Sequence, residues 1–184
     1  MNFLMWLKSL FGAKQHTNSR QAAQASLAID LETTGATQPQ KIAYYSSLVE
    51  HLQQDHQHLI GLYSAVLQSI EHTQYTQIAS QLEQFKSDFH AHLQAENIKL
   101  YGFLEQSLAH QTEEFKQMRQ YRREMRSIES VVNKFLSYWI ESRVDAENIQ
   151  QFIQEFQQIG AALVKRIESE ENALYPMYQD YVTS

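Results

Sequence analysis

Apolar residues recur every three or four positions along the chain from Ile42 onward. This spacing places them on one face of an α-helix, and no segment shows the alternation of period two that is typical of a half-buried strand. The stripes predict four long helices, over residues 41–71, 74–108, 112–141 and 145–178. Asp145 is suited to cap the last helix, and Pro176 marks a point where that helix could break.

Only a few residues separate one predicted helix from the next. Short connections place consecutive helices side by side and in opposite directions. We therefore expect an all-α fold, an antiparallel up-down-up-down four-helix bundle. The predicted bundle domain spans residues 41–182.

The first forty residues have a different pattern. Residues 1–12 predict a short amphipathic helix that ends at Gly12, and residues 13–40 are polar and predict a flexible linker. The helix could pack on its own domain, dock on a protein partner or make a peripheral contact with a membrane. The apolar face available for such a contact consists of Phe3, Trp6, Leu7, Leu10 and Phe11.

The composition excludes several classes of protein. The chain of 184 residues has no cysteine, which excludes disulfides and thiolate metal sites and fits a reducing cytoplasm. A formal net charge of −6 argues against a general nucleic-acid binder, and no apolar run is long enough for a transmembrane helix. Common catalytic motifs are absent as well, so we expect no enzyme. We expect a cytoplasmic protein, with a peripheral position at the inner face of the membrane if the N-terminal helix makes the membrane contact.

Two segments of the chain are near-copies of each other. The run from His92 to Tyr101 recurs as the run from Arg166 to Tyr175, and both close on Leu-Tyr. In each copy a glutamate follows the first residue by four positions, so the two side chains share one helix face. Histidine with glutamate makes half of a metal site, whereas arginine with glutamate makes a salt bridge.

Several polar residues lie on the predicted apolar stripes, where a charge is costly unless it is paired or bound to a metal. In an antiparallel bundle these residues can lie at one level, and we expect them to converge. The candidate metal ligands are His56, His92, Glu96 and Glu170. The alternative is a hydrogen-bonded core cluster without a metal.

At these residues the chain resembles the hemerythrin-like HHE cation-binding family over about residues 45–178. In that family each half of a four-helix bundle supplies one histidine and a His-x-x-x-Glu motif, and the halves together hold two bridged iron ions. The first half of this chain has the full pattern, with His56 followed by His92-x-x-x-Glu96. The second half keeps only Glu170, because Met125 and Arg166 stand where the family has histidines.

These departures predict a degenerate metal centre. A thioether is a poor ligand for iron, and a protonated guanidinium cannot bind a metal, so the second iron position should be lost. Two imidazoles and two carboxylates would still suit one divalent ion, iron first and manganese or zinc otherwise. Arg166 could supply the missing positive charge, or it could pair with Glu170 or Glu96 in a site that binds no metal. With one iron the resemblance implies sensing or regulation rather than oxygen transport.

A second set of residues resembles the regulator-of-sigma-D anti-sigma family, whose bacterial members are metal-free four-helix bundles that bind the primary sigma factor. The similarity lies in Ile159-Gly160-x-Ala162-Leu163-x-x-Arg166-x-x-x-Glu170-Glu171, in Leu48-Val49-Glu50 and in His58-Leu59-Ile60-x-x-Tyr63. It implies a metal-free interaction module. Such a module would leave His56, His92 and Glu96 without a role, so this is the alternative to the metal-binding hypothesis.

Overall fold

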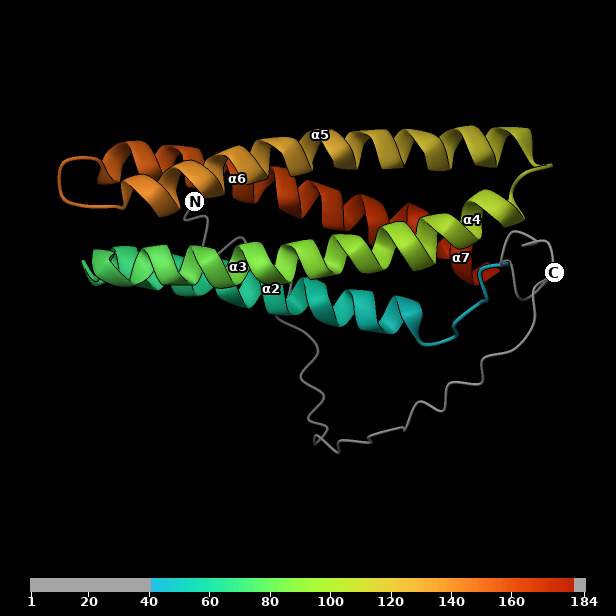
Figure 1. The fold of residues 1–184 in the computed structure, drawn as a ribbon, viewed down its shortest axis with the longest axis horizontal. Helices are drawn as coiled ribbons and strands as arrows, with labels where there is room; N and C mark the ends of the chain where they lie inside the picture. Colours follow the sequence, from blue (N-terminus) through green and yellow to red (C-terminus); the bar gives the residue numbers. More distant parts are fainter. Residues whose placement is uncertain (1–40, 181–184) are drawn as a thin grey trace, which may run out of the picture. The chain divides into compact units, whose positions relative to one another are not determined.

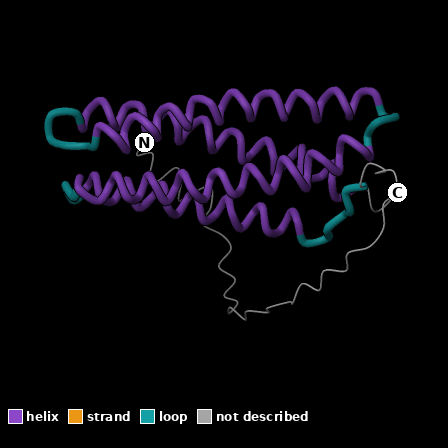
Figure 2. Tube along the Cα trace, viewed as in Figure 1, coloured by secondary structure: helices purple, strands orange, loops and turns teal. Residues whose placement is uncertain are grey.

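The computed structural model describes residues 41–180, and every regular element within them is a helix (Figure 2). The predicted N-terminal helix, the linker and residues 181–182 of the predicted domain lie outside the described residues. The long helices are α2 (Leu48–Glu71), α3 (Tyr75–Ala95), α5 (Thr112–Ser142) and α6 (Ile149–Ser169). They run alternately up and down, with α2 on α3, α3 on α5 and α5 on α6 (Figure 1). The predicted antiparallel four-helix bundle is confirmed.

Two of the helices continue through a wider π-helical turn. Helix α3 passes through η1 (Glu96–Leu100) into α4 (Tyr101–Ser107), and α6 passes through η2 (Glu170–Leu174) into α7 (Tyr175–Asp180). Pro176 does not break the last helix, because it lies where the hydrogen-bond register changes from π to α and its missing N–H is tolerated.

The first helix begins later than predicted, at Leu48 rather than at residue 41. Its expected first turns are held out of the helix by distant side chains. The backbone N–H of Ile42 donates to Gln106 Oε1 at 3.0 Å, and that of Tyr45 donates to the Tyr178 hydroxyl at 2.8 Å. The last long helix also begins later than predicted, at Ile149 with Asn148 as its N-cap rather than at Asp145. Asp145 Oδ1 accepts from the backbone N–H groups of Glu147 and Asn148, which holds these residues in a turn before α6.

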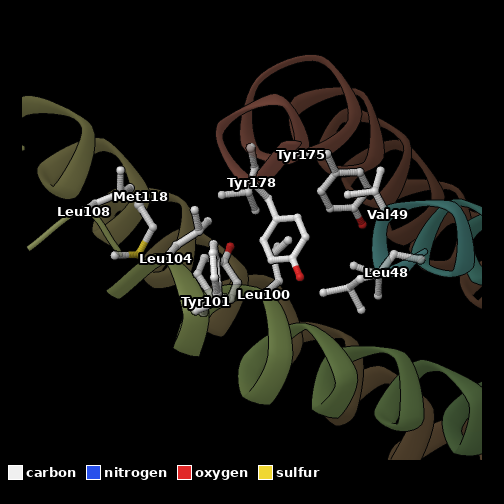
Figure 3. Close-up of a cluster of buried hydrophobic side chains, with 12 residues drawn as sticks. Leu48, Val49, Leu100, Tyr101, Leu104, Leu108, Met118, Tyr175 and Tyr178 are labelled. Atoms are coloured by element: carbon white, nitrogen blue, oxygen red, sulfur yellow. The ribbon is translucent and has the colours of Figure 1, made fainter. Parts of the chain in front are cut away.

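A buried apolar cluster fills the end of the bundle where α4 and α7 lie (Figure 3). It brings together the start of α2, the start of α5 and both π-helical segments. Two of its tyrosines, Tyr101 and Tyr175, direct their hydroxyls to buried polar groups rather than to other apolar residues. The cluster therefore fixes the position of the polar site beside it. Within residues 41–180 no helix is both long and apolar enough to cross a membrane.

Candidate metal centre

Three of the four predicted ligands meet in the bundle interior. His56 from α2, His92 from α3 and Glu170 from η2 each offer one ligand atom, and these atoms lie within 4.8 Å of one another. All three side chains are buried. His56 Nε2 lies 3.1 Å from Glu170 Oε2, and the two imidazole rings are 4.7 Å apart at their centroids.

The fourth predicted ligand, Glu96, borders this group through a tyrosine. Glu96 is the first residue of η1 and is fully buried. Its Oε1 accepts a hydrogen bond of 3.0 Å from the Tyr175 hydroxyl, which also lies 3.3 Å from His56 Nε2. Its Oε2 has no hydrogen-bond partner. A buried carboxylate oxygen without a partner is costly unless something else, such as a cation, satisfies it.

Each histidine has a second carboxylate on its outer side. His56 Nδ1 lies 2.8 Å from Glu171 Oε1, and His92 Nδ1 lies 3.6 Å from Asp55 Oδ2. The hydrogen bond with Glu171 orients the His56 ring and directs its Nε2 towards the buried group. The separation of 3.6 Å at His92 is too long for a hydrogen bond, so its Nδ1 faces Asp55 without a partner. Neither Asp55 nor Glu171 is among the residues predicted from the sequence, although each stands directly beside a predicted ligand in the chain.

The second half of the chain departs from the histidine pattern at Arg166 and at Met125. The guanidinium of Arg166 is buried; Nε donates to Glu170 Oε1, and Nη2 donates to the Tyr101 hydroxyl at 2.8 Å. Nη1 donates to the backbone carbonyl of Tyr121 on α5 at 3.2 Å. Met125 is buried one helical turn after Tyr121. Arg166 thus places a buried cation against Glu170 and links it to Tyr101 and to the backbone of α5.

The two copies of the repeat are also related in structure. In each copy the glutamate is the first residue of a π-helical segment, and the closing tyrosine begins the next α-helix. Tyr175 donates to Glu96 of the other copy, and Tyr101 accepts from Arg166 of the other copy. Single π-helical turns occur frequently at functional sites. Apolar spacing does not reveal such a turn, but its repetition at Glu96 and Glu170 coincides with the repeated motif.

Burial and charge set the protonation of this cluster. Burial opposes the charged form of His56, yet its contacts with Glu170 and Glu171 raise the pKa of His56 to about 9. Burial, with the charge of Glu170 nearby, raises the pKa of Glu96 to about 8. For Glu170 burial acts the same way, but His56 and Arg166 outweigh it and keep its pKa below the usual value. Glu170 is therefore the ionised carboxylate, between two cations.

These shifts predict that the metal-free protein loses stability as the pH rises from 6.5 to 9.5. The ordinary pKa of histidine is 6.5 and that of His56 is about 9, so in this range the folded chain holds a proton that the unfolded chain has released. Glu96 acts in the same direction, between its ordinary value of 4.5 and about 8. The stabilising contribution of His56 is complete below pH 6.5 and is lost as the pH passes through about 9.

Urea unfolding in the presence of a chelator, followed by circular dichroism, measures this effect. The urea midpoint should fall steadily across the range. Replacing Glu96→Gln should make the decline shallower, because the amide does not titrate. A midpoint that stays constant or rises with pH would contradict the assigned protonation states.

The donor atoms gathered here are of the kind that hold a transition-metal ion. Two imidazoles, the ionised Glu170 and the unsatisfied oxygen of Glu96 provide the nitrogen and oxygen ligands that divalent transition metals take in proteins. Oε1 of Glu170 already accepts from the guanidinium of Arg166, which cannot itself bind a metal.

The fold and this cluster define a helical bundle with a buried His/Glu centre, and comparison with known proteins gives the family. The family model of the hemerythrin HHE cation-binding domain matches residues 47–178. The chain therefore belongs to the hemerythrin HHE cation-binding domain family. No curated protein and no solved structure matches it significantly.

Proposed function

We propose that the bundle binds a single divalent transition metal, iron in the first place, through His56, His92, Glu96 and Glu170. The observation that carries the proposal is the arrangement of the two imidazoles. His56 Nδ1 is hydrogen-bonded to the outer Glu171, His92 Nδ1 faces Asp55, and both rings offer a ligand atom within 4.8 Å of one from the buried Glu170. A histidine whose outer nitrogen contacts a carboxylate is typical of metal sites.

We further propose a sensing or regulatory role, without enzyme activity, in the cytoplasm. A bound iron ion would supply a redox-active centre, and oxygen, nitric oxide or redox state are the signals to which it could respond. In the family, reversible oxygen transport relies on two bridged iron ions. Arg166 and Met125 stand where histidines would bind the second iron ion, so we do not propose oxygen transport. The N-terminal segment would carry the signal to a protein partner or a membrane surface.

The metal content of the purified protein tests the proposal. Protein prepared anaerobically and given Fe(II), then desalted, should retain about one equivalent of iron by elemental analysis. His92→Ala should lower this value to below about a tenth of an equivalent. His90→Ala is the matched control, because His90 lies on the same helix but is exposed and bonded to Asn133, and it should retain the full equivalent. Wild-type protein that retains less than about a tenth of an equivalent of any transition metal would overturn the proposal.

The alternative function is a metal-free interaction module, and one observation supports it. Arg166 and His56 already neutralise Glu170, so this carboxylate is satisfied without a metal. Binding of the primary sigma factor, as in the regulator-of-sigma-D family, is the specific form of this alternative. It requires that metal-free protein retains sigma factor in a pull-down, and a pull-down without sigma factor or RNA polymerase counts against it.

A further inference from the structure

A small cavity opens on the bundle surface directly outside the buried cluster. It has a volume of about 270 Å³ and lies between α2 and α3. Its lining consists of Asp55, His58, Leu59, Asp88, Ala91 and His92. A water molecule takes up about 30 Å³ of liquid volume, so the cavity has room for a cation with several of its waters.

The mouth of this cavity carries ligands of the same type as the interior. His58 Nε2 lies 2.8 Å from Asp88 Oδ2, and both side chains reach solvent. The side chain of Asp55 is about half exposed, and its Oδ2 lies 3.6 Å from His92 Nδ1. Asp88 also accepts from Gln84 Nε2 at 2.9 Å, a contact on the solvent side of the mouth that a cation could displace. Carboxylates and an imidazole are ligands of the kind that divalent transition metals take.

His92 connects the cavity with the buried cluster. Its side chain is only 4% exposed, yet it lines the cavity. Its Nδ1, on the side of Asp55, is buried and has no hydrogen-bond partner. The same ring packs against His56 and offers a ligand atom to the group of three. One imidazole thus borders both the outer cavity and the inner site.

We propose that this cavity is the uptake route of the metal. Asp55, His58 and Asp88 capture a hydrated divalent transition-metal cation from solvent, and the ring of His92 turns to pass it inward to His56 and Glu170. The inference rests on the proposed function, because it assigns a role to residues outside the centre that the function requires. It predicts that His58 and Asp88 affect the rate of metal uptake and leave the final metal content unchanged.

Rapid mixing of the metal-free protein with Co(II), followed by its visible absorption, tests the route. The double variant His58→Gln, Asp88→Asn should take up Co(II) at least about tenfold more slowly than wild type. Ala91→Leu, which narrows the mouth without removing a polar group, should also slow uptake. Glu83→Gln is the matched control, because Glu83 is exposed on the same helix and its loss changes the charge as Asp88→Asn does.

The outcomes separate the route from the function. If wild type takes up Co(II) and both cavity variants take it up at the wild-type rate, the route is wrong and the metal centre stands. A lower final content in the double variant would also overturn the route, because it would place His58 and Asp88 in the stability of the centre itself. If wild type takes up neither Co(II) nor Fe(II), the proposed function fails, and the route fails with it.

Discussion

Arg166→Met should destabilise the metal-free protein by about 3 kcal/mol, close to the low end of what removing one partner of a buried ion pair costs. Methionine is similar in length to the apolar part of arginine, so the loss comes mainly from the guanidinium. Without it, Glu170 stays buried with His56 as its remaining cation, and the Tyr101 hydroxyl loses its donor. Such a loss is a large part of the stability of a single domain.

Urea unfolding in a chelator at pH 7 measures this prediction, and the midpoint should fall by more than about 1 M. Lys165→Met removes the same charge from the neighbouring position, which is exposed, and should leave the midpoint within about 0.3 M of wild type. Arg166→Lys should fall between the two, because an ammonium keeps the charge but is too compact to reach Glu170, the Tyr101 hydroxyl and the backbone carbonyl on α5 at once. If Arg166→Met unfolds at the wild-type urea midpoint, the contacts of the guanidinium do not stabilise the folded protein.

The apolar pattern predicts the helices because each of them buries one continuous stripe. It places the start of the first helix wrongly, since the backbone of Tyr45 is held by the hydroxyl of Tyr178, more than a hundred positions away in the chain. No local pattern contains that contact. The π-helical turns escape prediction for a related reason, because one extra residue in a turn shifts the stripe too little to be seen.

The candidate metal centre, like the fold, could be predicted from the sequence only in part. His56, His92 and Glu170 could be predicted to converge, because a charge on an apolar stripe needs a partner and an antiparallel bundle brings the middles of its helices to one level. The hydroxyl of Tyr175 between Glu96 and His56 could not, because it depends on the exact rotation of α7. Packing details of this kind are decided by the fit of whole side chains and leave no periodic signal.

The arrangement of the second half suggests how the lost metal position could be restored. Arg166 corresponds to His92 in the repeat, and its guanidinium spans from Glu170 on one side to the backbone of α5 on the other. Met125 lies one turn further along α5 and is buried. Histidines at these two positions would complete the family pattern of one histidine and a His-x-x-x-Glu motif in each half, and would remove the cation that competes with a second metal.

We therefore expect the double variant Met125→His, Arg166→His to bind about two equivalents of Fe(II) under anaerobic conditions, where wild type binds about one. Without metal the variant should be less stable than wild type, because Glu170 has lost its guanidinium, and added Fe(II) should recover that loss by binding the folded state alone. Elemental analysis and urea unfolding with and without Fe(II) measure both effects. Met125→His alone is the matched control and should remain at about one equivalent, since Arg166 still fills the position. A double variant with wild-type helicity that binds no more iron than wild type would contradict the view that Arg166 stands in for a metal.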